Sequence, residues 1–555
     1  MKSFKLIILL TVVFLPALVY SQASKDTVKT KNLGESEVFI LKSYQPVLND
    51  AFKINLTPSI DTSTAKTPIL KYDVDPRPMN SNFNLTPIKP VKIKDETIKK
   101  LYHGFLKVGY GLENMPMVDF YYNTIRSKQF VAGVSFKHLS STGKIKDYGY
   151  PGNSNNELGI HGTKFFPTFS LSANVNYDRD VVHFYGYNSP PDLYTKGETK
   201  HSMNDVNGKF SLSSLSQKKD DWKYNGKIEF YSFKDNRASS ESNVGVFADA
   251  GNNIDIGFLS GNISYEAMKI NQPLQKYNHG IFRMLPNLKI KKELYLIDLG
   301  ANLVIESNDG ETFYHFYPKV NANYQIIDDQ LSVFAGISGD VIRNDLRSFS
   351  KENPYLSDYT KLRNTNNKIK INGGTKIKLA HDLMFLAEGS YGRYTNQPFY
   401  YNKDSLTYPV SYAIVYDDVN LFTLKSAIEY KMGEKILFGA NILFNNYKTD
   451  GLEHPLYVPL YKLGINGAYT IADKITAKVD LFYNGESYGI EYNSAIPTYT
   501  KLKSYFDANL SVDYRYSKLL SVFVQLNNLG FSQEFRYYRY PSYRFTGLAG
   551  VTLSF

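Results

Sequence analysis

The nine histidines are the residues of this chain best suited to acid–base or metal chemistry, but their spacing builds no site. No His-Glu-x-x-His pattern or other tight metal-ligand spacing occurs in the sequence. His381 lies beside Asp382 in a predicted turn, where a solvated turn explains the pair better than a catalytic dyad. We therefore predict no bound metal and no cofactor.

Covalent catalysis also lacks its usual sequence signals. The chain contains no cysteine, which removes thiolate nucleophiles, thiolate metal ligands and disulfides. The sequence has no Gly-x-Ser-x-Gly nucleophile elbow and no Walker-type phosphate loop. A Ser-His-Asp triad stays open, because triad members need not be neighbours in the chain. On balance we predict that the protein is not an enzyme.

Two predicted loops are rich in tyrosine and form the best candidates for a binding surface. The candidate residues are Tyr400, Tyr401, Tyr412, Tyr537, Tyr538 and Tyr540. Exposed tyrosines with Arg536 and Arg539 interleaved suit a sugar or a protein surface. The alternative is that these rings pack within the loops or form an interfacial girdle, and we favour this alternative.

From residue 101 onward the sequence alternates between apolar and polar residues, which predicts β-strands. In residues 505–516, for example, Phe506, Ala508 and Leu510 alternate with Asp507, Asn509 and Ser511. Charges recur at the middle of the polar face, as a water-filled lumen allows. The aromatic content of 15% is typical of interfacial girdles in outer-membrane barrels. We predict a transmembrane antiparallel β-barrel of about 22 strands over residues 101–555.

The connections between these predicted strands alternate in length, as periplasmic turns and extracellular loops do. Short connections are predicted near residues 127–128, 218–220, 252–253, 292–293, 328–329, 381–382, 433–434, 472–473 and 517–518. Longer ones are predicted at residues 144–155, 189–199, 343–367, 393–418, 449–460, 486–501 and 531–543. The first connection, near Glu113, is short for an outer loop.

The first hundred residues differ from the rest of the chain. Lys2 and Lys5 precede an apolar run at residues 6–18, which predicts a signal peptide over residues 1–21. Residues 22–100 are rich in proline, which prevents long helices and central strands. We predict an extended segment here, periplasmic or folded into the lumen. Its one strand-like run, residues 37–41, includes Val38, Phe39 and Ile40 as a candidate partner-binding strand.

The last strand carries an apparent assembly signal. Gly550, Leu553 and Phe555 fit the Gly-x-x-Φ-x-Φ core (Φ is an apolar residue) with which outer-membrane barrels end, although Leu548 replaces a usual polar residue. About 22 strands, a terminal aromatic, and Asn528-Leu529 before a Tyr-rich loop resemble TonB-dependent outer-membrane transporters. The resemblance covers residues 101–555 and implies transport across the outer membrane.

The chain departs from that family at its N-terminus. TonB-dependent transporters carry a plug domain of well over a hundred residues, whereas only about 80 residues precede the barrel here. A barrel of this size without a plug would be a large pore, unless residues 22–100 fill it, a partner seals it, or the strands collapse around inward side chains. The Lys-, Asn- and Tyr-rich composition suggests a Bacteroidota-type bacterium.

These features lead to two functional hypotheses. The first is a plugless, transporter-like barrel that passes or docks a solute, helped by a surface lipoprotein. The second is a non-transporting structural or accessory subunit of an outer-membrane assembly or secretion complex. We expect location in the outer membrane of a Gram-negative bacterium after signal-peptide cleavage. The net charge of +11 is scattered, which favours outer-membrane lipids and lipopolysaccharide over nucleic acid as counterparts.

Overall fold

The computed structural model describes residues 101–555 except 126, 188–192, 217, 219, 358, 404–408, 434 and 492–497. The predictions for the signal peptide, for residues 22–100 and for Val38, Phe39 and Ile40 lie outside the described residues. No helix in the described part of the chain is long and apolar enough to cross a membrane.

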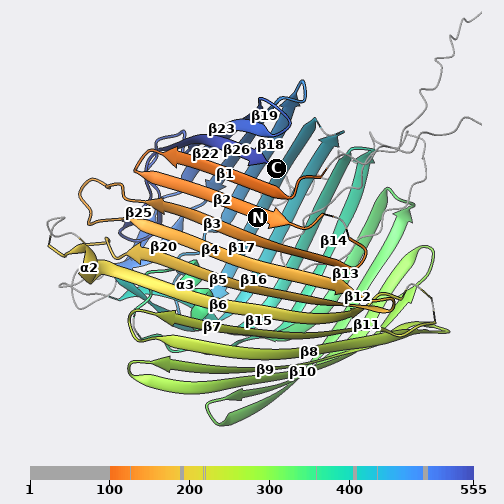
Figure 1. Ribbon diagram of the computed structural model, residues 1–555. Helices are drawn as coiled ribbons and strands as arrows, with labels where there is room; N and C mark the ends of the chain where they lie inside the picture. Colours follow the sequence, from red (N-terminus) through yellow and green to blue (C-terminus); the bar gives the residue numbers. More distant parts are fainter. Residues whose placement is uncertain are drawn as a thin grey trace, which may run out of the picture. The chain divides into compact units, whose positions relative to one another are not determined.

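The described residues form a closed antiparallel β-barrel of 22 strands, which confirms the predicted fold class (Figure 1). Each strand pairs with its neighbours in chain order, and the last strand pairs with the first to close the ring. The first half comprises β1 (Gly104–Gly111), β2 (Met115–Asn123), β3 (Phe130–Ser141), β4 (Asn153–Phe165), β5 (Phe169–His183), β6 (Lys200–Ser214), β7 (Lys223–Asp235), β8 (Ser240–Ile254), β9 (Gly257–Gln272), β10 (Gln275–Lys291) and β11 (Tyr295–Asn308). The second half comprises β12 (Glu311–Ile327), β13 (Leu331–Ile342), β14 (Thr365–Ala380), β15 (Leu383–Lys403), β16 (Ser411–Met432), β17 (Ile436–Thr449), β18 (Tyr461–Ile471), β19 (Ile475–Asn484), β22 (Tyr505–Arg515), β23 (Leu520–Asn527) and β26 (Thr546–Ser554).

Short elements occupy some of the connections. They are the helices α2 (Lys196–Thr199) and α3 (Leu346–Glu352), the hairpin of β20 (Ser487–Glu491) and β21 (Thr498–Leu502), and the hairpin of β24 (Phe535–Tyr537) and β25 (Tyr540–Pro541). We call the end of the barrel that carries these elements the loop end. The opposite end, where turns are short, we call the turn end.

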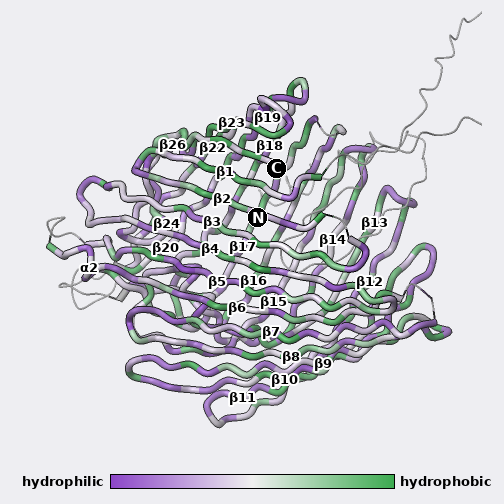
Figure 2. Tube along the Cα trace, in the orientation of Figure 1, coloured by the Kyte–Doolittle hydropathy of each residue, from purple (hydrophilic) through white to green (hydrophobic). Residues whose placement is uncertain are grey.

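The two faces of the barrel wall differ in chemistry because side chains alternate along each strand. Outward residues such as Ile160 and Val246 are apolar and about half exposed, at 58% and 47%. Inward residues such as Asp205 and Glu241 are charged and almost fully buried. Figure 2 shows this alternation of hydrophobic and hydrophilic residues along the strands. The apolar outer face fits a hydrocarbon environment, and the polar inner face fits a hydrated lumen.

Most predicted turns fall between strands of the structure, with informative exceptions. The predicted turn at residues 252–253 lies inside β8, and the chain turns at residues 255–256 instead. Four loop-end connections are as tight as turns, at residues 112–114, 236–239, 273–274 and 309–310, and the first of these was predicted to be short. Residues 393–418 were predicted as a loop, but β15 continues to Lys403 and β16 begins at Ser411. The two strands pair along this extension, from Gln397 with Asp417 to Lys403 with Ser411.

The seam between β26 and β1 closes the ring at a point of close approach. Gly550 lies directly opposite Gly109, and the backbone groups of Gly104 and Phe555 exchange two hydrogen bonds of 2.7 and 3.0 Å. A Cβ atom on Gly550 would overlap the carbonyl oxygen of Val108 and the Cα atom of Gly109. Leu553 and Phe555 point outward, 39% and 47% exposed. Their role as an assembly signal stays a prediction, but Gly550 also has a steric reason to be glycine.

We expect Gly550→Ala to weaken barrel closure, because the added methyl group meets backbone that cannot move without breaking the seam. Overpacking of this kind costs roughly 1–3 kcal/mol. The heat-modifiable band shift of the folded barrel, followed across a urea series, should show a lower midpoint.

The matched control is Gly547→Ala on the same strand. Its new Cβ would meet side-chain atoms of Leu112 and Leu526 at 3.5 Å, which is ordinary van der Waals contact. Equal loss of stability in the two variants would contradict the proposed role of the seam.

Candidate functional site

The connection between β13 and β14 folds into the barrel and forms the candidate site. We call residues 343–364 the crossing segment. The segment contacts β6, β8 and β10 on one side of the ring and β15 and β16 on the other. Strands β6 and β16 stand ten places apart around the 22 described strands of the ring. The contacts with β15 and β16 fall on their extension at the loop end, where residues 397–403 pair with residues 411–417 and with neither β14 nor β17. Figure 1 shows α3, which belongs to this segment, behind β5 and β6.

Local sequence explains why the segment starts as a helix. Asp345 is the N-cap of α3, and its carboxylate accepts a hydrogen bond of 2.7 Å from the Ser348 backbone. Leu346 and Phe349 form the buried face of the helix. Arg347 and Lys351 lie four residues apart within α3, which places two cations along one side of the helix, and Arg343 precedes the N-cap.

Those cations meet carboxylates on the inner wall. Arg347 donates two hydrogen bonds to one oxygen of Asp205, at 2.8 and 2.6 Å. Lys351 donates to Asp205 at 2.8 Å and to Asp178 at 3.2 Å. The Asp205 side chain is only 3% exposed. Removal of both cations would leave the buried Asp205 carboxylate without a cationic partner, which is strongly unfavourable.

A second group of charged residues holds the start of the segment. Glu241 is 1% exposed and accepts hydrogen bonds of 2.6 Å from the Leu346 backbone and from the Tyr231 hydroxyl. Arg343 pairs with Glu266, which also accepts a bond of 2.8 Å from Arg283. The segment therefore has charge-assisted hydrogen bonds to β6, β8 and β9. Leu346 and Phe349 also share a hydrophobic cluster with residues of this wall, among them Met203 and Met268.

Aromatic residues hold the other side of the segment. The Tyr400 hydroxyl donates to Glu352 at 3.1 Å, and the Tyr537 hydroxyl donates to the Glu352 carbonyl at 3.1 Å. Backbone bonds of 2.9 and 2.7 Å join Tyr412 to Tyr355 and to Ser357. This side combines backbone pairing and the burial of aromatic rings with the hydrogen bonds to Glu352.

The aromatic contacts extend to two further loops. The Tyr355 ring stacks on the Tyr540 ring with centroids 3.7 Å apart, and the Tyr185 hydroxyl donates to the Pro541 carbonyl at 2.8 Å. Burial raises the pKa of the Tyr355 phenol to about 12, so the ring stays neutral at physiological pH. The loops after β5, β13, β15 and β23 therefore share one hydrophobic cluster at the loop end.

The predicted binding tyrosines belong to this cluster or lie beside it. Exposed fractions are 8% for Tyr400, 0% for Tyr412, 6% for Tyr537 and 4% for Tyr540. Tyr401 and Tyr538 are partly buried. The structure thus shows loop packing for four of the six rings, which was the favoured alternative. A ligand-binding role for the six tyrosines stays a prediction and would require these rings to become exposed.

The crossing segment itself was predicted only as a long loop. The spacing of Arg347 and Lys351 after Asp345, a usual helix-capping residue, was the signal that could have indicated a short helix with two cations on one side. Within the described ranges, no group of three or more His, Cys, Asp or Glu side chains is placed to hold a metal ion.

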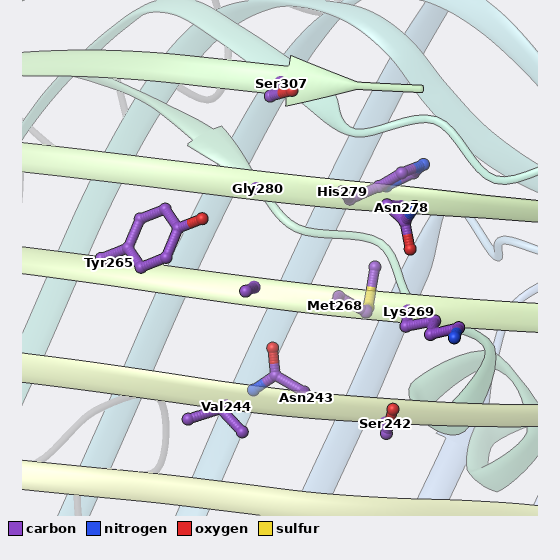
Figure 3. Close-up of a pocket in the computed structure, with 11 residues that line it drawn as sticks. Ser242, Asn243, Val244, Tyr265, Met268, Lys269, Asn278, His279, Gly280 and Ser307 are labelled. Carbon is purple, nitrogen blue, oxygen red and sulfur yellow. The ribbon is translucent and has the colours of Figure 1, made fainter. Parts of the chain in front are cut away.

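A shallow pocket of about 380 Å3 lies in the wall over β8, β9, β10 and β11 (Figure 3). Val244 and Tyr265, both 52% exposed, line it together with Lys269. The pocket is open at Ala267 and Gly280 because these residues have almost no side chain. The Tyr265 ring points toward Gly280 in Figure 3. Two other lining residues, Asn243 and Met268, are buried. They lie on β8 and β9, the strands that also carry Glu241 and Glu266, the carboxylates that contact the crossing segment.

We expect the double variant Arg347→Ala/Lys351→Ala to release the crossing segment from β5 and β6, because Asp205 and Asp178 lose their cationic partners. Backbone hydrogen exchange of peptides from residues 343–364, measured by mass spectrometry, should rise at least tenfold. Lys361→Ala is the control, since Lys361 is an exposed cation of the same segment. Unchanged exchange in the double variant would show that the charge pairs do not hold the segment.

Glu534 gives the loop after β23 a pH dependence. Burial, reinforced by the nearby Asp507, raises the pKa of Glu534 from an ordinary value of 4.5 to about 7. The folded loop therefore favours the protonated acid, so its stability is greatest below about pH 4.5 and falls as pH rises through about 7. Exchange of residues 528–545, corrected for intrinsic rates, should increase over this window. Glu534→Gln should remove the dependence, and an identical pH profile in that variant would contradict the assignment.

Comparisons with known proteins add a likeness of fold. No protein-family model matches the chain, and no curated protein matches it in sequence. The siderophore receptor PirA from Acinetobacter baumannii is similar in structure, with a TM-score of 0.64, 10% identity, and coverage of 83% of this chain and 81% of that chain.

Two receptors from Pseudomonas aeruginosa are similar to the same degree. A variant of the ferric enterobactin receptor PfeA in complex with enterobactin gives a TM-score of 0.63 at 12% identity, covering 83% of this chain and 82% of that chain. The pyoverdine outer membrane receptor FpvA bound to pyoverdine gives 0.61 at 11% identity, covering 83% and 79%. The chain therefore has the barrel fold of outer-membrane receptors.

Proposed function

We propose that this protein is an outer-membrane barrel that passes or docks a solute, and that the crossing segment is its barrier. The observation that carries the proposal is the attachment of residues 343–364 both to the inner wall at β6 and β8 and to the loop-end extension of β15 and β16. A polar inner wall and a likeness in fold to siderophore receptors support solute passage.

The two attachments of the segment differ in a way that suits a gate. Contacts with β6 and β9 include ion pairs, which water or a charged solute can replace. Contacts with Tyr400, Tyr412 and Tyr540 combine hydrogen bonds with aromatic burial, and the burial has no substitute in water. The segment would therefore leave the charged wall first and remain anchored at the aromatic cluster.

The rest of the chain fits this role as a further set of proposals. Residues 1–21 direct export, and residues 22–100 form a periplasmic or lumenal segment of a transporter-like barrel without a plug. A surface lipoprotein would deliver the solute. The Bacteroidota-type origin suggested by the composition belongs to the same set.

The test is ion conductance in planar bilayers for four forms of the protein. They are the wild type, Arg347→Ala/Lys351→Ala, a deletion of residues 22–100, and the combination of both changes. We expect each change to raise the conductance and the combination to give the largest value. Lys361→Ala should match the wild type.

Absence of conductance in all four forms would contradict solute passage. That result would favour the alternative of a structural or accessory subunit of an outer-membrane assembly or secretion complex. An increase only after deletion of residues 22–100 would retain passage but remove the crossing segment as the barrier.

A further inference from the structure

The outer face of β3 to β8 carries a second, larger groove of about 810 Å3 toward the turn end. We propose that this groove binds one acyl chain of an anionic phospholipid whose phosphate contacts Lys164. The inference does not depend on solute passage, because it requires only that the barrel span a membrane. The strands concerned lie side by side in Figure 1.

Small residues in register create the groove. Ala132 pairs with Gly162, and Gly162 pairs with Ala173, so three adjacent strands present almost no side chain at one level. Farther along, Gly226 pairs with Ala248. A Cβ atom on Gly226 would meet nothing within 4 Å, and one on Gly162 would find its nearest atom at 3.7 Å. The floor of the groove is therefore open rather than filled by neighbouring side chains.

Large apolar side chains form the walls. Phe130, Leu171 and Phe210 line the groove and are 50%, 42% and 48% exposed. The groove lies on the apolar outer face of a membrane-spanning barrel, so hydrocarbon is the medium that surrounds it. An extended acyl chain fits a long apolar groove, and its contact with these walls removes apolar surface that would otherwise be incompletely packed.

Charge at the rim selects the headgroup. Lys164 lines the groove, is exposed, and lies one residue before the end of β4 at the turn end. Its Nζ atom stands 5.2 Å from the centroid of the Phe166 ring, which keeps the cation near the wall. A lysine at this level meets the phosphate of a phospholipid whose tail enters the groove, and an anionic headgroup adds to that attraction.

The protein contains its own reporter for this site. Trp222 is the single tryptophan of the chain, is 62% exposed, and precedes β7. Four residues along a strand separate Trp222 from Gly226, which is about 13 Å. A brominated acyl chain in the groove should therefore quench the fluorescence of Trp222.

The experiment titrates the full-length protein in detergent with brominated phosphatidylglycerol and records Trp222 fluorescence. We expect quenching that saturates at about one lipid per protein. Gly162→Leu fills the groove from β4, away from Trp222, and should raise the half-saturating lipid concentration at least tenfold. Gly261→Leu is the matched control, because a Cβ there also meets nothing within 4 Å but Gly261 does not line the groove.

Headgroup recognition has its own pair of variants. Lys164→Gln should raise the half-saturating concentration of brominated phosphatidylglycerol about fivefold, as expected for one lysine near an anionic lipid surface. The same change should leave brominated phosphatidylcholine nearly unaffected. Lys292→Gln, an exposed lysine between β10 and β11 at the turn end, should match the wild type.

Three results would overturn the proposal. Quenching that grows without saturation shows bulk lipid alone. Identical titrations for the wild type and Gly162→Leu show that the groove is not the site. Displacement of the brominated lipid by lipopolysaccharide at lower concentration than by unlabelled phosphatidylglycerol assigns the groove to another lipid.

Discussion

Closure of the strand ring is the constraint on which the rest of this structure depends. In a bilayer, every backbone N–H and C=O group must find a partner within the protein, and an antiparallel ring provides one for each strand. The pairing of β26 with β1 completes that ring. The two glycines at the seam, Gly109 and Gly550, allow the backbones to approach without a Cβ atom between them.

A ring of this size also leaves a space to be filled, because 22 strands enclose more volume than inward side chains can occupy. In the described part of the chain, the crossing segment occupies some of that space, with ion pairs to the inner wall at β6 and with aromatic and hydrogen-bond contacts at the loop end. Charged side chains suit the first wall because the lumen is polar. The aromatic cluster suits the loop end, where several loops meet and exclude water together.

The sequence predicted the barrel well because alternation is a local property. In β22, Phe506 and Tyr514 face outward as expected, because consecutive side chains of a strand point to opposite faces of the sheet. Contacts between distant residues could not be predicted in the same way. Asp205 and Arg347 are 142 positions apart, and neither shows its partner in its own neighbourhood. Residues 397–403 were assigned to a long connection because short and long connections alternate along the chain, yet their aromatic residues also favour strands, and pairing with β16 decided the outcome.

The most direct test of the central claim uses the absence of cysteine from the native chain. Asp205→Cys and Arg347→Cys would be joined by a bifunctional methanethiosulfonate reagent that reductant cleaves, and single-channel conductance would be recorded before and after reduction. The account predicts low conductance while the link holds the crossing segment to β6, and a clear rise once the link is cleaved. The same conductance in both states, with the link confirmed by mass spectrometry, would contradict the role of the segment as the barrier.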